Sequence, residues 1–452
     1  MEQYPGRMKK IRIGSGAGYA GDRLEPALEL MEHGNLNYIC FEGLAERTIA
    51  LAQKAKKADP EKGYNDLLLY RMEKVLPLAH KNKIKVITNM GAANPKKAME
   101  EVAKLATTLG LKNLKVAAVL GDDITEKIHN YTSKTVIETG EPLSEINKEL
   151  FSANAYLGYD GIVEALSNDA DIIITGRVAD PSLFLAPLLY EFGWKKTDWE
   201  KMGIATMIGH LLECAGQVTG GYFADPGVKE VPDLWNLGFP LVEVNDAGEG
   251  FITKLDHTGG MVTTATCTEQ LLYEIHDPEN YLTPDCTADF SKVTFKKIQK
   301  DIIGFSGASG KSPTTTYKVS VGYLNGFIAE GQISYGGPNC IARALLAKEI
   351  VEKRLENLSF PISELRCDLI GINSLFDKGE MPKEINEVRL RLAGKTNTKE
   401  QAQFIANEVE TLYTNGPYGG GGATKKVDEI ISIASILVPK DDFEINVLYK
   451  TT

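Results

Sequence analysis

A glycine-rich break after the first strand-like run is the feature that most constrains how this chain folds. The apolar, β-branched run at 11–13 gives way to a segment containing Gly14, Gly16, Gly18 and Gly21, and an amphipathic stretch follows. Glycine adopts positive φ at low cost and lets a ligand approach the backbone closely. The pattern therefore predicts a strand, a tight turn and a helix, which is how an α/β unit begins.

Three of these glycines also satisfy the spacing of a dinucleotide-binding loop. Gly16, Gly18 and Gly21 match G-x-G-x-x-G, and Glu42 follows the next strand-like run, where a ribose-binding acid is expected. Asp22 argues against a dinucleotide, because it would place a carboxylate where the pyrophosphate should lie. The sequence leaves three interpretations open: a site for a small molecule or phosphate, an NAD site, and a tight turn that binds no ligand.

Composition excludes several classes of protein. The chain has 452 residues, which predicts about two or three domains. Its net charge of −11 disfavours nucleic acid and anionic membranes as partners, since both require basic surfaces. No apolar run approaches the length of a membrane-spanning helix, and no apolar signal core precedes the first strand. Six cysteines without a C-x-x-C pair indicate reduced thiols. We therefore expect a cytoplasmic protein without a metal site.

Strand-like and helix-like patterns alternate through the first 180 residues. Apolar runs such as that at 171–175 are typical of strands buried on both faces of a parallel sheet. We expect an α/β fold in which residues 1–224 form a ligand-binding domain with a doubly wound, mostly parallel sheet. Glycine, proline and β-branched residues become more frequent afterwards, which predicts a smaller α+β domain over 225–452. The expected strands of the first domain are 10–13, 37–41, 84–88, 114–120 and 171–175.

Ligands of open parallel sheets bind beyond the carboxyl ends of the strands, so the residues that follow the expected strands form the candidate site. Arg47 and Arg177 are candidate anion clamps, because a guanidinium binds carboxylate or phosphate with two hydrogen bonds. The alternative is a salt bridge to a neighbouring acid such as Glu42, Glu46 or Asp180. The candidate substrate-binding residues are Gly16, Gly18, Gly21, Arg23, Arg47, Asn89, Asn94 and Arg177.

Asp22, Glu42 and Asp180 are the candidate catalytic acids and bases. Carboxylates crowded into one cleft have raised pKa values, which general acid–base catalysis near neutral pH requires. Asp180 has an alternative role as a helix cap. Asn89 and Asn94 are candidate donors to a substrate oxyanion, or residues that stabilise turns.

Two further motifs carry less weight. The glycine-rich segment 304–312 is not a P-loop, because Phe305 stands where the first glycine is required and strand-like sequence follows. We expect a mobile loop there, and this segment and the glycines at 419–422 are alternative ligand-covering loops. His210 and Glu213 lie three residues apart on one helix face, a spacing that metal sites use. No further ligands accompany them, so a structural role is favoured.

Several long motifs resemble those of the acyclic terpene utilisation protein family. The resemblance implies a role in the bacterial degradation of branched terpenoid acids through acyl-CoA intermediates. It also implies that longer relatives carry an extra C-terminal ferredoxin-like domain before which this chain stops, so a separate small ferredoxin-like subunit is a candidate partner. The matching segments are 12–23, 41–48, 88–95, 174–181, 209–217, 221–227 and 318–323, and the likeness continues to Ala423.

The sequence thus supports three functional hypotheses. The first is a catabolic enzyme that acts on a small branched carboxylate or its CoA thioester by hydratase or lyase acid–base chemistry. The second is an NAD-dependent oxidoreductase, which rests on the glycine spacing and Glu42. The third is a non-catalytic, ligand-binding or accessory subunit of a complex. A homo-oligomer is expected in each case, and the sequence identifies no cofactor.

Overall fold

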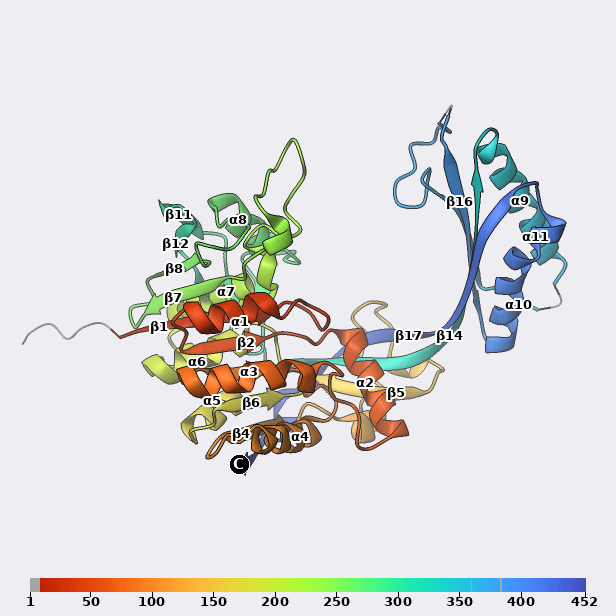
Figure 1. The fold of residues 1–452 in the computed structure, drawn as a ribbon. Coiled ribbons are helices and arrows are strands. Elements are labelled where there is room, and N and C mark those ends of the chain that lie inside the picture. Colours follow the sequence, from red (N-terminus) through yellow and green to blue (C-terminus); the bar gives the residue numbers. More distant parts are fainter. Residues whose placement is uncertain (1–8, 359, 383) are drawn as a thin grey trace, which may run out of the picture. The chain divides into compact units, whose positions relative to one another are not determined.

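The computed structural model describes residues 9–358, 360–382 and 384–452. They divide into two compact units (Figure 1). The first unit contains the chain up to Asn147 together with Phe151–Gly322 and Ile433–Thr452, and the second contains Lys148–Leu150 and Tyr323–Ser432. The boundary expected at residue 225 therefore lies inside the first unit.

The first unit is built on a mixed sheet with the strand order β11-β12-β8-β7-β1-β2-β3-β6-β4-β18. Strands β1, β2, β3, β6 and β4 run parallel to one another, whereas β7, β8, β12, β11 and β18 are antiparallel to their neighbours. The α/β class is confirmed, but the sheet as a whole is mixed, because the chain after residue 225 adds strands to it. The strands are β1 (Lys10–Ala17), β2 (Tyr38–Phe41), β3 (Lys85–Thr88), β4 (Lys115–Leu120), β6 (Ile172–Thr175), β7 (Leu241–Asn245), β8 (Gly250–Thr253), β11 (Thr294–Gln299), β12 (Ile302–Ser306) and β18 (Asn446–Thr451).

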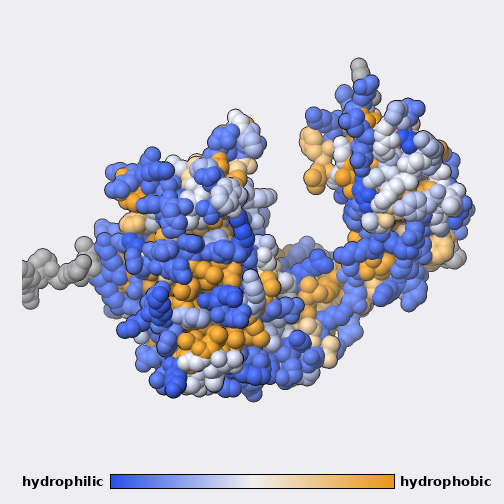
Figure 2. Space-filling view, in the orientation of Figure 1, coloured by the Kyte–Doolittle hydropathy of each residue, from blue (hydrophilic) through white to orange (hydrophobic). Residues whose placement is uncertain are grey.

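Helices α1, α3 and α4 cover one face of this sheet, as Figure 1 shows. Leu30, Val75 and Val102, one from each helix, pack in a single core with Ile39 and Val86 of the sheet, and all are at most 1% exposed. Figure 2 shows apolar residues between these helices and hydrophilic residues over much of the remaining visible surface of this unit. The bounds are α1 (Glu25–His33), α2 (Glu46–Ala58), α3 (Leu68–Asn82) and α4 (Pro95–Thr108).

Helices α5, α6 and α7 pack side by side, and α6 contacts β2 while α7 contacts β1. Almost every residue of α7 from Met202 onward is buried, which is typical of a helix enclosed by the protein on all sides. No described helix is long and apolar enough to cross a membrane. The bounds are α5 (Asp160–Ser167), α6 (Ser182–Phe192) and α7 (Trp199–Glu213).

A small sheet and helix α8 enclose α7 further. Strand β13 comes so close that a Cβ atom on Gly203 would lie 2.1 Å from the Ser309 backbone, so only glycine fits there. The expectation of a mobile loop over 304–310 is wrong, because the end of β12 and the start of β13 occupy most of it. The bounds are α8 (Thr264–Leu272), β9 (Tyr281–Leu282), β10 (Thr287–Asp289) and β13 (Ser309–Lys311).

The second unit has the element order β14-α9-β15-β16-α10-α11-β17 and the strand order β15-β16-β14-β17. This is the split β-α-β arrangement of ferredoxin-like folds. The ferredoxin-like arrangement that the resemblance places in a separate domain is thus present within this chain. Strand β5 pairs with β14. The bounds are β5 (Leu150–Ala155), β14 (Thr316–Gly336), α9 (Cys340–Glu356), β15 (Glu364–Ile370), β16 (Glu387–Thr396), α10 (Lys399–Glu410), α11 (Leu412–Asn415) and β17 (Gly420–Pro439).

Candidate functional site

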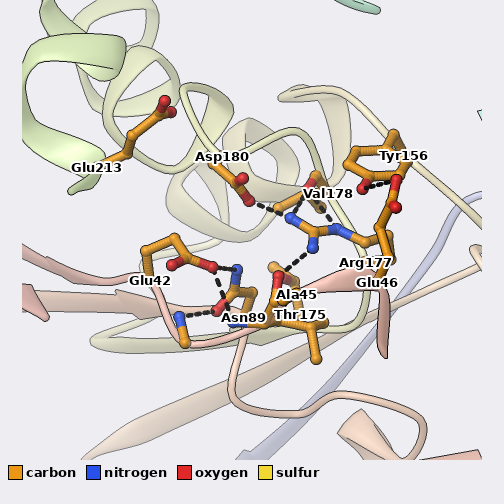
Figure 3. A network of polar contacts seen from close by, with 12 residues as sticks. Glu42, Ala45, Glu46, Asn89, Tyr156, Thr175, Arg177, Val178, Asp180 and Glu213 are labelled. Carbon is orange, nitrogen blue, oxygen red and sulfur yellow. Dashed lines mark hydrogen bonds and ion pairs between the residues drawn. The ribbon is translucent and has the colours of Figure 1, made fainter. Parts of the chain in front are cut away.

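The loops that leave the carboxyl ends of β2, β3 and β6 bring a group of polar side chains together (Figure 3). Glu42 follows β2, Asn89 follows β3, and Arg177 and Asp180 follow β6. Parallel neighbours end at the same edge of a sheet, so residues far apart in sequence meet there. The strand-end argument from the sequence places Asp22, Arg23, Glu42, Arg47, Asn89 and Arg177 at one cleft. Of these, the structure brings Glu42, Asn89 and Arg177 together, with Asp180 beside them.

Glu42 is a buried carboxyl group, 8% exposed, that is held in one orientation. Its Oε1 accepts hydrogen bonds from the Leu44 backbone at 2.7 Å and from Asn89 Nδ2 at 3.1 Å, while its Oε2 has no hydrogen-bond partner among the described residues. Burial, and secondarily the charge of Asp180, raise the pKa of Glu42 to about 8, although Arg177 and the two hydrogen bonds oppose the rise. The carboxyl group is therefore protonated at neutral pH and can act as a general acid.

Arg177 is enclosed and committed to protein partners, being 1% exposed. It forms an ion pair with Asp180, donates to the carbonyl oxygens of Leu44 and Val178, and lies 4.5 Å from the centre of the Tyr156 ring. Burial alone would lower the pKa of the guanidinium, but Asp180 and its other neighbours raise it overall. Of the two roles that the sequence allows for Arg177, the salt bridge is the one observed.

Asp180 is the solvent-accessible member of that ion pair, since its side chain is 35% exposed. Its position is fixed by Arg177, because the guanidinium cannot move without breaking its bonds to the buried carbonyl groups. The charge of Asp180 raises the pKa of Glu42 on one side and that of Glu213 on the other. Asp180 thus acts on two carboxyl groups whose pKa values are raised, and burial raises the pKa of Asp180 as well, although Arg177 opposes that rise.

A second ion pair borders the site. Glu46 Oε1 accepts hydrogen bonds from Lys318 Nζ at 2.7 Å and from the Tyr156 hydroxyl at 2.9 Å. Burial alone would raise the pKa of Glu46, but Lys318 and Tyr156 lower it overall, so Glu46 is ionised. The sequence did not identify Lys318 as a site residue, because it is 272 residues from Glu46 and its matching segment carries no recognisable chemistry.

Asp122 fixes the loop that carries Arg177. Its Oδ2 accepts hydrogen bonds from the Arg177 backbone and from Asn154 Nδ2, both at 2.9 Å, and Gln53 holds Asn154 in turn. A Cβ atom on Gly176 would lie 2.5 Å from the Asp122 carboxylate, so this approach requires glycine. Burial raises the pKa of Asp122 to about 6, although its hydrogen bonds oppose the rise.

His210 and Glu213, at the end of α7, form a buried hydrogen-bonded pair. His210 Nδ1 lies 2.8 Å from Glu213 Oε1, and His210 Nε2 lies 3.2 Å from the Leu271 carbonyl oxygen. Burial lowers the pKa of His210 to about 4, and burial together with Asp180 raises that of Glu213. Among the described residues no three histidine, cysteine or acidic groups are placed to hold a metal ion.

The glycine-rich segment packs against protein and leaves little room for a ligand. A Cβ atom would lie 2.6 Å from the Phe41 ring at Gly16 and 2.6 Å from the Cys214 backbone at Gly18. Asp22 accepts hydrogen bonds from the backbone of Gly18 and of Arg23, so its carboxylate closes the loop. The observation that favoured an NAD site is thereby explained by packing.

The other candidate residues lie apart from this group. Arg23 donates to the Trp235 carbonyl at 2.8 Å, and the Asn94 side chain caps α4 by accepting from the Lys97 backbone. Arg47 is exposed and makes no hydrogen bond or ion pair with any residue that the structure describes. Gly21 is exposed beside Tyr19. Arg47 follows Glu46 at the start of α2, so among these four residues it is the one at the margin of the site.

Two surface depressions, of about 580 and 710 Å³, lie beside α8. Thr264, Thr268 and Leu272 line both of them. Neither is lined by Glu42, Asp180 or Arg177, so these two depressions do not coincide with the concentration of titratable groups. We base the site on the titratable groups, because their geometry is specific and the depressions are shallow surface features.

Comparison with known proteins gives one match. A family model described as acyclic terpene utilisation family protein AtuA matches residues 11–449, so it spans every residue of the site described above. No curated protein and no solved structure matches the chain.

Proposed function

The chain belongs to the acyclic terpene utilisation family, and from this premise we propose that it is an enzyme that adds water to, or removes it from, a small branched acyl compound. The observation that carries the proposal is the buried Glu42 carboxyl group, which is oriented by hydrogen bonds from Asn89 and the Leu44 backbone and whose pKa is raised to about 8 by burial and by Asp180. Two carboxyl groups in different protonation states are what acid–base catalysis on one substrate requires.

The two carboxyl groups have complementary roles in the dehydration direction. Asp180 removes a proton from the carbon next to the acyl carbonyl, and Glu42 donates its proton to the hydroxyl group on the following carbon. The C–O bond breaks, its electron pair leaves with the oxygen as water, and the electrons of the C–H bond form the C=C bond. Asp180 ends protonated and Glu42 ionised, and proton exchange with solvent restores them. Hydration is the same sequence in reverse.

The charges around the site select an uncharged reacting group. Asp180 and Glu46 are negative, and the charge of Arg177 is already paired with Asp180. Each acid is paired with one cation, Asp180 with Arg177 and Glu46 with Lys318, so the group has no spare positive charge for a further carboxylate or phosphate. The anionic end of the substrate, such as the phosphates of a CoA thioester, therefore binds outside this group. Arg47, exposed at the start of α2, is the cation that we assign to it.

Spectrophotometric assay with a branched enoyl-CoA tests the proposal, because hydration removes the absorbance of the conjugated thioester. We expect turnover by the purified chain and a loss of about 10²–10⁴-fold in kcat for Glu42→Gln, which keeps the shape but cannot donate the proton. Glu25→Gln, at the exposed start of α1, is the matched control and should leave kcat unchanged. No turnover in either direction, or full activity of Glu42→Gln, would contradict the proposal.

A further inference from the structure

The turn between β9 and β10 presents a buried aspartate to the loop that follows β6. Thr283 holds this turn, since its hydroxyl oxygen accepts hydrogen bonds from the backbone of Asp285 at 3.2 Å and of Cys286 at 3.1 Å. Lys440 Nζ donates to the Pro284 carbonyl oxygen at 2.7 Å and fixes the turn further. Asp285 is 6% exposed, so the residues around it enclose its carboxyl group.

Asp285 joins two segments that are distant from it in the sequence. Its Oδ1 accepts a hydrogen bond from the Tyr159 backbone at 3.1 Å, and its Oδ2 accepts one from the Ser182 hydroxyl. A Cβ atom on Gly158 would lie 2.0 Å from Asp285 Oδ1, so this approach requires glycine. Burial raises the pKa of Asp285 to about 7, although the hydrogen bonds from Ser182 and Tyr159 oppose the rise. The ionised carboxylate accepts from the Ser182 hydroxyl and the protonated acid can donate to it, so either form keeps this contact.

The segment that contains Tyr159 pairs with the loop after β6. The Leu157 carbonyl oxygen accepts from the Ala179 backbone at 2.9 Å, and the Leu157 N–H donates to the Arg177 carbonyl oxygen at 3.3 Å. The two segments therefore run side by side as a short parallel bridge. Because Tyr159 is only two residues beyond this bridge, the hydrogen bond from Tyr159 to Asp285 holds the bridge in place.

Buried carboxyl groups thus hold the loop at both of its ends. Asp122 accepts from the Arg177 backbone where the loop begins, and Asp285 binds Ser182 where it ends. Asp180 lies between these points, two residues before Ser182, and its side chain is the solvent-accessible partner of Arg177. A displacement of about 1 Å at a reacting group can cost about 10²-fold in rate, so the position of this loop matters for any reaction at Asp180.

We propose that Asp285 is a positioning residue, which fixes the loop after β6 so that Asp180 reaches the substrate. The inference rests on the proposed function, in which Asp180 is the general base. Asp285 is enclosed by protein and does not touch the reacting atoms. It acts through Ser182 and through the segment that contains Tyr159.

Hydrogen exchange tests whether Asp285 holds the loop, without reference to catalysis. Asp285→Ala removes the acceptors of the Tyr159 N–H and the Ser182 hydroxyl. Exchange should therefore become faster in peptides that cover 155–160 and 177–184, and stay unchanged in peptides from α4, which are the internal control. Asp285→Asn should exchange as the unaltered protein does, because its amide oxygen accepts from Tyr159 and its amide nitrogen donates to Ser182.

Steady-state kinetics with the branched enoyl-CoA test whether the loop serves the reaction. Asp285→Ala should lower kcat by about 10–10²-fold and leave KM unchanged, because the substrate still binds while Asp180 is displaced. Asp285→Asn should restore kcat. Ser182→Ala added to Asp285→Ala should cause no further loss, since both remove the same contact. Asp160→Ala is the matched control, because Asp160 is an exposed aspartate at the start of α5 whose charge acts on Asp285, and it should leave kcat unchanged.

The outcomes separate this inference from the proposed function. Unchanged exchange over 177–184 in Asp285→Ala overturns the inference, and so does faster exchange with an unchanged kcat. Neither result affects acid–base catalysis by Glu42 and Asp180. An unaltered protein without turnover overturns the proposed function, and the exchange measurement alone then decides whether Asp285 holds the loop. If Asp285→Ala does not fold, Ser182→Ala, which removes only a hydroxyl group, is judged by the same two measurements and the same criteria.

Discussion

Asn89 bridges the backbone and the acid of the site: its Nδ2 donates to Glu42 Oε1 at 3.1 Å while its Oδ1 accepts from the Gly43 backbone at 2.8 Å. Both of its polar groups make hydrogen bonds, and Asn89 thereby orients Glu42. The hydrogen bonds to Oε1 favour a geometry in which the proton of Glu42 is carried on Oε2. This arrangement has consequences for stability as well as for catalysis.

Glu42 should make the protein less stable as the pH rises from about 4.5 to about 8. The ordinary pKa of the carboxyl group is 4.5, and the fold raises it to about 8, so the folded state binds the proton more tightly than the unfolded chain does. The stabilising contribution is complete below the unfolded pKa and is lost as the pH rises through the folded pKa. Thermal unfolding measured across this pH range should show that Tm falls less steeply with pH in Glu42→Gln than in the unaltered protein. Identical slopes in the two proteins would show that Glu42 does not hold its proton in the fold.

Asp122 should matter more for stability than its neighbour Asp123. Asp122→Ala leaves the Arg177 backbone N–H and Asn154 Nδ2 buried without their acceptor, which should cost about 2–5 kcal/mol. Asp123→Ala removes a carboxylate that is 31% exposed and 3.4 Å from Lys56, and should cost about 1 kcal/mol or less. Denaturant unfolding of both variants measures the difference. Equal losses of stability in the two variants would mean that the hydrogen bonds to Asp122 do not hold the loop that contains Arg177.

The buried parallel strands could be predicted because each is a continuous apolar, β-branched run. Those expected at 84–88 and 171–175 match β3 and β6 to within one residue at either end. The full length of strand β14 could not be predicted, because Asn325 and Gly326 interrupt the strand-like pattern. The structure keeps one strand with Gly326 at a φ of 94°. Strand β17 was missed because its first half is rich in exposed charged residues and shows no alternation of polar and apolar positions.

The site could be predicted only where sequence position determines spatial position. Glu42 and Arg177 follow parallel strands, so the topology alone places them together. The residues that set the protonation and orientation of the site's side chains come from distant parts of the chain, so their positions depend on long-range packing. Lys318 reaches Glu46 from β14, and Leu271 determines the tautomer of His210 from α8. The packing of the glycine-rich segment could not be predicted for the same reason, since the Phe41 ring on the neighbouring strand decides what lies against Gly16.

Arg47 should bind the anionic end of a CoA thioester. Arg47→Ala should raise KM about tenfold, as expected for the loss of a charge-assisted hydrogen bond, while kcat stays unchanged. Arg23→Ala is the matched control, because Arg23 is also exposed but donates to the Trp235 carbonyl. Steady-state kinetics at low and moderate salt distinguish the two, since the Arg47 contribution should weaken with ionic strength. A change in kcat instead of KM would place Arg47 in the chemical step and contradict the assignment.

The glycine-rich segment offers the clearest test between packing and ligand binding. Gly16→Ala and Gly18→Ala each place a methyl group 2.6 Å from protein atoms, against the Phe41 ring and the Cys214 backbone, and should lower stability by about 1–3 kcal/mol. Gly21→Ala places it 3.1 Å from the Tyr19 side chain, which is 61% exposed and can move aside, so its effect should be within about 0.5 kcal/mol. Urea unfolding ranks the three variants. If all three variants were as stable as the unaltered protein but failed to bind a dinucleotide, the segment would be a cofactor loop. A substitution in a cofactor loop impairs binding of the cofactor, whereas a substitution at a packed position lowers the stability of the fold.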